Sequence, residues 1–154
     1  MAEIIPYGEK YAKPVKAFIL GILEDEFGIR GEKRPDLDDI SCTYQRNKSN
    51  FWVAVDRGKV VGTIALMDYG SKRGYLKRMY VARELRGSGL AAELLNTLIE
   101  FARKNGMRGL YCGTVGKLAA ANKFYQKHGF LKIEKLPGDM PEFGDDVFYL
   151  LGLQ

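Results

Sequence analysis

The fold of this chain is decided by the stretch from Met79 to Leu95, which reads "MYVARELRGSGLAAELL". A β-prone run that ends at Val81 is followed by a linker of five residues and then by two glycines, Gly87 and Gly89. From Leu90 onward, apolar residues recur at helical spacing. The first amides of a helix have no partner within the helix, and the helix dipole favours negative charge there. The stretch therefore predicts a strand, a glycine-rich turn and a helix whose start binds an anion.

Three kinds of phosphate-binding turn compete for this stretch. A P-loop is excluded, because the nearby Gly116-Lys117 pair is followed by leucine and the upstream glycine position is Tyr111. "GSGLAA" does match the G-x-G-x-x-A pattern of a Rossmann turn, but the linker separates it from the strand, and the downstream acid is missing. In the third kind, free backbone amides converge on one point, glycines let phosphates approach, and Arg86 adds positive charge. This arrangement suits a pyrophosphate.

Composition limits the function classes. The 154 residues fit one domain with a real core, which we place over residues 1–154. The net charge of +5 is too modest and too scattered for a nucleic-acid surface, so we expect no nucleic-acid partner. Two cysteines in unrelated contexts indicate neither a disulfide framework nor a metal site. No export signal and no apolar run of membrane-spanning length is seen, so we expect a cytoplasmic protein with no membrane partner.

The rest of the pattern predicts a mixed α/β sheet with helices on both faces. The expected strands cover residues 3–8, a hairpin over 51–67, and then 74–82, 107–114, 130–136 and 146–153. The expected helices cover residues from 10 to 27, 35–46, 90–103 and 117–127. A hairpin-rich first half is thus followed by a βαβαβ half.

At this point the sequence resembles a known family. "MYVARELRGSGLAAELL" resembles the acetyl-CoA motif of the GNAT N-acetyltransferase superfamily, R/Q-x-x-G-x-G/A after a strand, with Arg86, Gly89 and Ala91 at the signature positions. "AANKFYQKHGF", Ala120 to Phe130, resembles the later family motif A-x-x-F-Y-x-x-x-G-F. The resemblance implies the GNAT acyltransferase fold, with a mostly antiparallel sheet. It also implies transfer of an acetyl group from acetyl-CoA to a primary amine of a small molecule or peptide, by direct attack in a ternary complex.

The resemblance also implies roles for particular residues on the donor side. The pyrophosphate would be held by Arg86, Gly87, Ser88, Gly89, Leu90 and Ala91, and the pantetheine arm by Met79, Tyr80 and Val81. Tyr125 would be the general acid, since a phenol can protonate the departing thiolate. Many family members carry an asparagine where this chain has Leu118. Asn122, one helical turn later, is a candidate substitute.

The acceptor side is less defined. Glu24 and Glu26, at the end of the first long helix, are candidate bases that would take a proton from the amine. The segment from Leu136 to Asp146 carries four acids and predicts an acidic rim that favours a cationic amine; the acids are Asp139, Glu142, Asp145 and Asp146. The resemblance leaves a homodimer open. The alternative function is a non-catalytic acyl-CoA-binding sensor or partner module.

Overall fold

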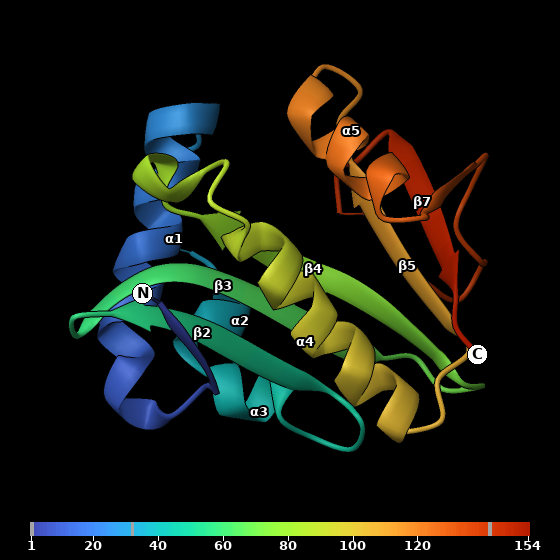
Figure 1. Ribbon diagram of the computed structural model, residues 1–154, viewed down its shortest axis with the longest axis horizontal. Helices are drawn as coiled ribbons and strands as arrows, with labels where there is room; N and C mark the ends of the chain where they lie inside the picture. The colour runs from blue at the N-terminus through green and yellow to red at the C-terminus, as the bar shows by residue number, and fades with distance from the viewer. Residues whose placement is uncertain (1, 32, 142) are drawn as a thin grey trace.

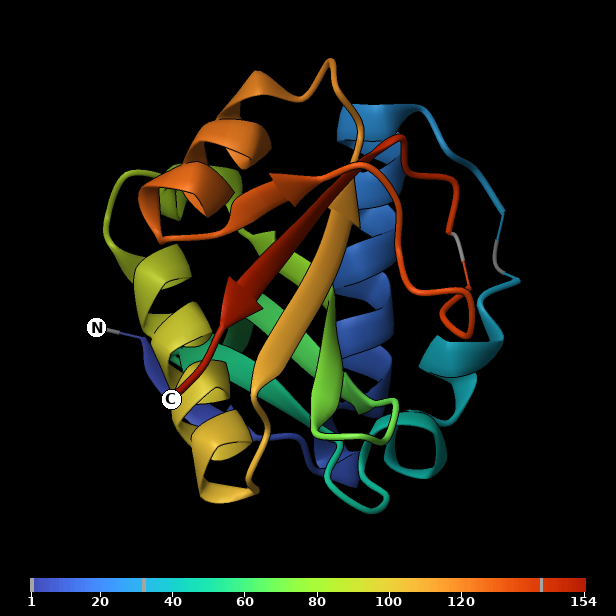
Figure 2. The same cartoon turned by 90° about the vertical axis from the view of Figure 1, so that its right-hand side faces the viewer.

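The computed structural model describes residues 2–31, 33–141 and 143–154. Over these residues the strands form one seven-stranded sheet in the order β1-β2-β3-β4-β5-β7-β6, with helices on both faces (Figures 1 and 2). Every neighbouring pair is antiparallel except β4 and β5. The predicted mixed, mostly antiparallel sheet is confirmed.

The elements follow the predicted order closely. The strands are β1 (Glu3–Pro6), β2 (Asn50–Asp56), β3 (Lys59–Asp68), β4 (Arg73–Val81), β5 (Gly109–Thr114), β6 (Leu131–Ile133) and β7 (Val147–Gly152). The α-helices are α1 (Ala12–Phe27), α2 (Pro35–Asp38), α3 (Ile40–Tyr44), α4 (Leu90–Lys104) and α5 (Ala119–Lys127). Two short 3-10 turns, η1 (Glu9–Tyr11) and η2 (Arg83–Leu85), precede α1 and α4.

The prediction of one helix over residues 35–46 was wrong, because two short helices meet there at Asp39. Its backbone is not helical, with φ −148° and ψ 73°. Its carboxylate accepts a hydrogen bond from the Cys42 amide and so caps α3. Aspartate side chains compete with helical hydrogen bonds in this way and favour a new helix start.

Two apolar layers cover the opposite faces of the sheet. Alternate residues of β2 enter different layers: Trp52 packs with the α4 side, and Phe51 and Val53 pack with the α1 side. This alternation is what a strand buried on both faces requires. Among the described helices, none has the length and apolar character needed to cross a bilayer.

The two central strands separate after a short contact. β4 and β5 pair over only three residues each, Arg73–Tyr75 with Gly109–Tyr111. Beyond that point β4 stays paired with β3 and β5 stays paired with β7, so each strand is held by its outer neighbour. Their facing edges diverge toward the end of the sheet where α5 lies (Figure 1). Backbone groups on diverging edges lack strand partners and are open to a ligand.

The paired part of β4 and β5 is tightly packed, which gives a stability prediction. A methyl group added at Gly74 would lie 2.6 Å from a Leu66 methyl and 2.7 Å from the Met107 sulfur. Gly74→Ala is therefore expected to lower the free energy of unfolding by about 1–3 kcal/mol, measured by urea denaturation.

Gly21→Ala is the matched control for this substitution. Gly21 lies inside α1, and an added methyl group would meet nothing within 4 Å. That change should raise the free energy of unfolding by about 0.5–1 kcal/mol, because alanine favours the helix. Equal effects at the two sites would contradict the packing described around Gly74.

Candidate functional site

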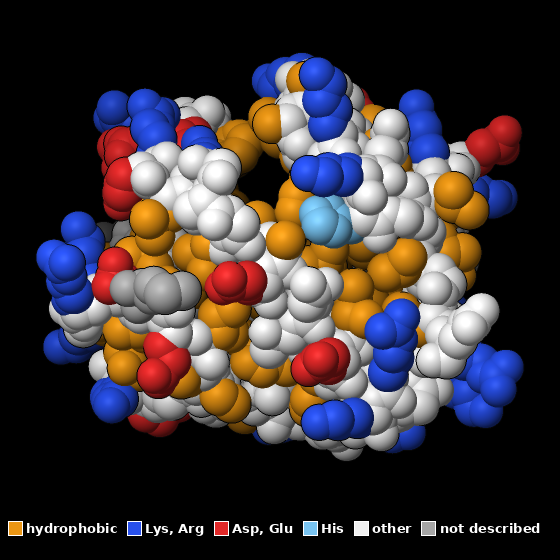
Figure 3. Space-filling view, in the orientation of Figure 1, with side chains coloured by type: hydrophobic (Ala, Val, Ile, Leu, Met, Phe, Trp, Pro, Cys, Tyr) orange, Lys and Arg blue, Asp and Glu red, His pale blue; other side chains and the backbone are white. Residues whose placement is uncertain are grey.

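A cleft of about 1050 Å³ opens where β4 and β5 separate. One wall is β4 from Tyr75 to Val81 and the glycine-rich turn before α4; the other is the end of β5 with α5. The C-terminal end of α1 and Gly144–Asp145 contribute to the lining at its mouth. Figure 3 shows the hollow between the two lobes of the molecule, with hydrophobic side chains around it. The same cleft is lined by the glycine-rich turn at one place and by Phe124 and Tyr125 of α5 at another.

The glycine-rich turn, which the sequence predicts to bind an anion, forms one end of the cleft. Gly87 and Gly89 have φ angles of 82° and 91°, a backbone conformation that side chains other than glycine rarely adopt. Both glycines line the cleft, and a side chain at either would meet only open space. Within the described chain, neither amide donates a hydrogen bond. With the first amides of α4 they leave several donors at a helix start, which is a site for phosphate groups.

Arg86 supplies the fixed positive charge beside these amides. Its guanidinium donates to the carboxylate of Glu26 at 2.6 Å and to the carbonyl of Val81 at 3.3 Å. Its side chain is 46% exposed, so it can also reach an anion in the cleft. Glu26 lines the cleft as well, but its carboxylate is held by Arg86 beside the glycine-rich turn. Nothing in this arrangement supports a role for Glu26 as the amine's base.

The unpaired edge of β4 forms the middle of the cleft. Ala82 donates its amide to Val61 on the β3 side. Because backbone groups alternate along a strand, those of Val81 face the opposite, open edge, in agreement with its carbonyl accepting from Arg86. Met79 lies two residues earlier on β4 and also lines the cleft. These backbone groups suit pairing with an extended amide chain such as pantetheine.

A bulge at Arg78 turns this part of β4. The β3–β4 pairing passes from Ala65–Lys77 to Thr63–Tyr80, so β4 carries one extra residue, and Arg78 has a φ of 52°. Its carbonyl accepts a hydrogen bond from the hydroxyl of the fully buried Thr63, at 2.7 Å. A buried hydroxyl thus replaces the missing strand partner.

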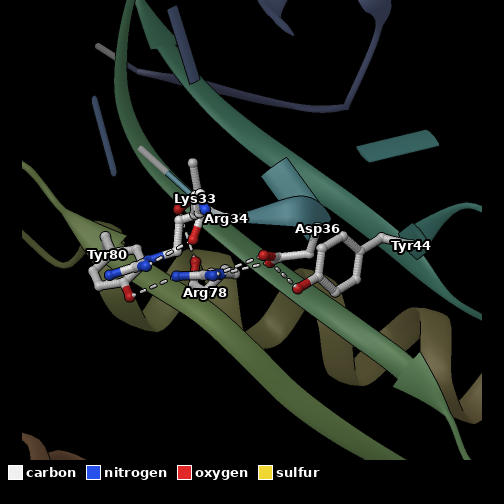
Figure 4. A network of polar contacts seen from close by, with 7 residues as sticks. Lys33, Arg34, Asp36, Tyr44, Arg78 and Tyr80 are labelled. Carbon is white, nitrogen blue, oxygen red and sulfur yellow. Dashed lines mark hydrogen bonds and ion pairs between the residues drawn. The ribbon is translucent and has the colours of Figure 1, made fainter. Parts of the chain in front are cut away.

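The side chain of Arg78 is held by a second set of contacts, shown in Figure 4. Its guanidinium donates two hydrogen bonds to the Asp36 carboxylate, at 2.8 and 2.9 Å, and Tyr44 donates a third to the same carboxylate at 2.6 Å. Burial alone would raise the pKa of Asp36, but these hydrogen bonds hold it below its usual value. The pair fastens α2 to the bulge, at the edge of the cleft where Arg34 and Tyr80 also lie.

Tyr125 lies where the cleft passes between β4 and α5. It is 7% exposed, lines the cleft, and packs against the rings of Phe124, Phe130 and Tyr149. Burial raises its pKa well above the usual value for a phenol. The hydroxyl therefore keeps its proton at neutral pH and is available as a donor.

Most of the residues predicted from the sequence for the donor side meet at this cleft. Those that line it are Met79, Tyr80, Val81, Arg86, Gly87, Gly89, Ala91 and Tyr125, together with Glu26. Ser88 and Leu90 do not: the Ser88 hydroxyl donates to the Leu85 carbonyl, and Leu90 is buried in the core under α4. Their backbone amides are also engaged within the turn: the Ser88 amide donates to the Leu85 carbonyl at 3.2 Å, and the Leu90 amide donates to the Ser88 hydroxyl at 3.4 Å.

Two further predicted residues lie outside the cleft lining. Asn122 uses its whole carboxamide within the protein, donating to the carbonyls of Val115 and Leu118 and accepting from the Tyr149 hydroxyl. It fastens the loop between β5 and α5, and its proposed contact with CoA gains no support. Glu24 forms an exposed ion pair with Arg30 at 3.5 Å.

The four acids of the predicted acidic rim do not act as one group in the structure. Asp139 pairs with Arg73, away from the cleft, and Glu142 lies outside the described residues. Asp145 lines the cleft and lies close to Tyr75. Sequence reasoning missed Tyr75 altogether, and the acid-rich segment was the only signal for Asp145.

The Asp36–Arg78 pair yields a stability prediction. The two side chains are 18% and 13% exposed, so Asp36→Asn leaves a largely buried guanidinium without its counter-charge. We expect a loss of about 3 kcal/mol in the free energy of unfolding. Asp38→Asn, which breaks an exposed pair with Lys16 on the same short helix, should cost under about 0.5 kcal/mol.

The pH dependence follows from the lowered pKa of Asp36. A carboxyl whose folded pKa is below its unfolded value stabilises the fold fully above about pH 5 and loses that effect as pH falls through the folded pKa. The stability gap between wild type and Asp36→Asn should therefore narrow below about pH 4 in urea titrations. A gap independent of pH would contradict the ion pair.

Comparison with known proteins places this chain in a family. The model of the Acetyltransferase (GNAT) family matches residues 17–130. An N-acetylaspartate synthetase from Danio rerio is 37% identical over 100 residues, which make up 64% of this chain and 36% of that protein. The chain thus spans about a third to a half of the length of the curated relatives that it matches first.

Solved structures agree over the whole chain. A GNAT-family acetyltransferase from Staphylococcus aureus Mu50 is 31% identical, with a TM-score of 0.94 and all of both chains covered. An acetyltransferase from Salmonella typhimurium, solved with acetyl-CoA, shares the fold with a TM-score of 0.77 at 21% identity, over 100% of this chain and 95% of that one. With a family model that covers most of its length and a full-length structural match, this chain belongs to the acetyltransferase (GNAT) family.

Proposed function

We propose that the protein transfers an acetyl group from acetyl-CoA to a primary amine by direct attack within a ternary complex. The observation that carries the proposal is the cleft itself. An open strand edge leads from a phosphate-binding helix start to a protonated, buried tyrosine, in the order that acetyl-CoA would need. A binding module would need the first two parts only, so the position of Tyr125 favours catalysis over the sensor alternative.

The donor would lie along the cleft in three parts. The pyrophosphate would accept hydrogen bonds from the amides of Gly87, Gly89 and Ala91, with Arg86 beside it. The pantetheine arm would pair with the backbone of Met79 and Val81. The thioester would then reach the end of the cleft near Tyr125.

The reaction needs proton transfers at two places. A neutral amine attacks the thioester carbon, the N–C bond forms, and the C–S bond breaks. Tyr125 donates its proton to the leaving sulfur and recovers a proton from the nitrogen, which loses one as it becomes an amide. A phenol with a raised pKa keeps its proton until the thiolate forms.

The activity can be tested without knowing the natural acceptor. The purified protein is incubated with acetyl-CoA and a panel of amines: the common amino acids, short peptides, spermidine and kanamycin. Release of CoA thiol is followed spectroscopically, and acetylated products are identified by mass spectrometry. Transfer to at least one amine is expected. Binding of acetyl-CoA without transfer to any amine would favour the sensor alternative.

A substitution at the start of α4 tests the donor site. Ala91 lines the cleft, whereas Ala92, on the same helical turn, is not part of its lining. Ala91→Glu places a carboxylate against the pyrophosphate position and should weaken acetyl-CoA binding about 100-fold or more in calorimetry. Ala92→Glu should weaken it by only a few-fold. Since an acid suits a helix start, neither change should lower stability.

Tyr125→Phe tests the general acid. The phenyl ring preserves the packing against Phe130 and Tyr149, so the fold should remain. We expect kcat to fall about 100-fold, because thiolate departs without a proton, while the KM for acetyl-CoA changes little. An unchanged kcat would assign Tyr125 to the core alone.

The cytoplasm is the proposed location, and a homodimer the proposed assembly. Both cysteines are free thiols in the structure, Cys42 exposed and Cys112 buried, which suits a reducing compartment. Light scattering of the purified protein would measure its assembly.

A further inference from the structure

The cleft contains, beside Asp145, a polar group that the fold does not use. Tyr75 is 2% exposed and lines the cleft, and its hydroxyl has no hydrogen-bond partner among the described residues. A buried hydroxyl without a partner costs stability, so such a group calls for a ligand or a bound water that completes its hydrogen bonds. Tyr75 is also the last residue of β4 that pairs with β5, so the hydroxyl lies where the two strands begin to part.

Asp145 lies beside this hydroxyl. A methyl group placed on Gly113 of β5 would be 2.6 Å from an Asp145 carboxylate oxygen and 3.0 Å from the Tyr75 hydroxyl. Both oxygens therefore converge over the same backbone position, which is accessible to them because residue 113 has no side chain. No hydrogen bond joins them to each other or to another described group. The Asp145 carboxylate and the Tyr75 hydroxyl therefore both keep hydrogen-bonding capacity that the described residues do not use.

The neighbouring residue holds Asp145 in this position. Asp146 donates its amide to the Thr114 carbonyl, and its carboxylate accepts from the Gly116 amide at 2.8 Å. Asp146 thus fastens the segment to the end of β5, and Asp145 lines the cleft beside it. Of these two adjacent acids, Asp146 holds the segment in place, whereas the Asp145 carboxylate is left open to a ligand.

We propose that Asp145 and Tyr75 form the binding site of the acceptor amine, and that the Asp145 carboxylate is the base that removes a proton from the amine. This rests on the acetyl transfer proposed above. The substrate ammonium, R–NH₃⁺, gives one proton to the carboxylate and becomes R–NH₂, which then attacks the thioester. That proton leaves through Asp145 to water, and it is the one net proton that the reaction releases.

The charges around Asp145 suit this task. Burial raises the pKa of the Asp145 carboxyl, and the charge of Asp146 raises it further, while Lys77 partly opposes them. Lys77 lies over the ring of Phe143, 3.6 Å from its centre, with its own pKa lowered by burial.

The remaining titratable groups that interact with Asp145 are neutral, because their pKa values are raised; they are the phenols of Tyr75 and Tyr125 and the Cys112 thiol. A more basic carboxylate is a better acceptor, and a nearby lysine cation disfavours a second cation, which favours the neutral amine.

Asp145→Asn is the first test, with the fastest amine of the panel as the probe. At pH 7 we expect kcat to fall about 100-fold, with acetyl-CoA affinity in calorimetry unchanged. The variant can react only with amine that is already neutral, so its deficit should shrink as pH rises toward the amine's own pKa, about 10 for an alkylamine. Asp139→Asn, in the same segment but outside the cleft, should keep wild-type kinetics.

Tyr75→Phe is the second test and separates ligand binding from folding. Removing an unpartnered buried hydroxyl should leave thermal stability unchanged or raise it, while the KM for the amine rises about 10-fold. A variant that loses stability and keeps its KM for the amine would show that the hydroxyl serves the fold, and would overturn the proposed amine-binding site.

The outcomes distinguish the two proposals. A wild-type protein that transfers to no amine would end the proposed function. Wild-type transfer together with a kcat for Asp145→Asn within twofold of wild type at pH 7, and an unchanged pH profile, would overturn the role of Asp145 alone.

Discussion

The early end of pairing between β4 and β5 is the constraint on which the rest of the structure depends. Three residues of each strand are joined, and beyond them each strand follows its outer partner, β3 or β7. A continuous sheet would have used every edge amide and carbonyl in its own hydrogen bonds. The divergence leaves one edge of β4 open in the interior of the domain, between the helices that cover the two lobes.

The divergence is stabilised by contacts that are distant in sequence. Thr63 satisfies the carbonyl of the bulged Arg78, and Asp36, 42 residues away, neutralises its side chain. On the other side, Asp146 fastens the β6–β7 segment to the end of β5. These anchors set the walls of the cleft. The residues assigned to the ligand, by contrast, are left with unused hydrogen-bonding capacity, as at Gly87, Gly89 and Tyr75.

Prediction from the sequence succeeded where the signal is local. The turn could be predicted because two glycines, a strand before them and an amphipathic helix after them all lie within one short stretch. In the structure both glycines, Gly87 and Gly89, have positive φ angles. Tyr125 was predicted from the resemblance of its segment to a family motif, and it lines the cleft. Asn122 shows the limit of that approach: its carboxamide is used up by a tyrosine of β7 and by two carbonyls of its own loop, contacts that no local pattern records.

The acceptor end could not be predicted for a related reason. Tyr75 looks like any core aromatic of a strand, and its hydroxyl is notable only because no described residue satisfies it. Asp145 is one of several acids in a loop. What separates it from the others is that the hydrogen bonds of Asp146 to Thr114 and Gly116 fix its position, and these contacts are visible only in the structure. Glutamates at the end of α1 were reasonable candidates by position, but both already have arginine partners. The direction of a loop side chain depends on the whole fold. The proposed acceptor site, which includes such a side chain, is therefore the part that is hardest to predict from the sequence.

The most direct test of this account is a crystal structure of the protein with coenzyme A. We predict pyrophosphate oxygens within hydrogen-bonding distance of the amides of Gly87, Gly89 and Ala91. The pantetheine arm should lie along Met79 and Val81, with its sulfur between the open edge of β4 and Tyr125. Coenzyme A bound elsewhere on the molecule, or β4 and β5 paired continuously beyond Tyr75, would contradict the account.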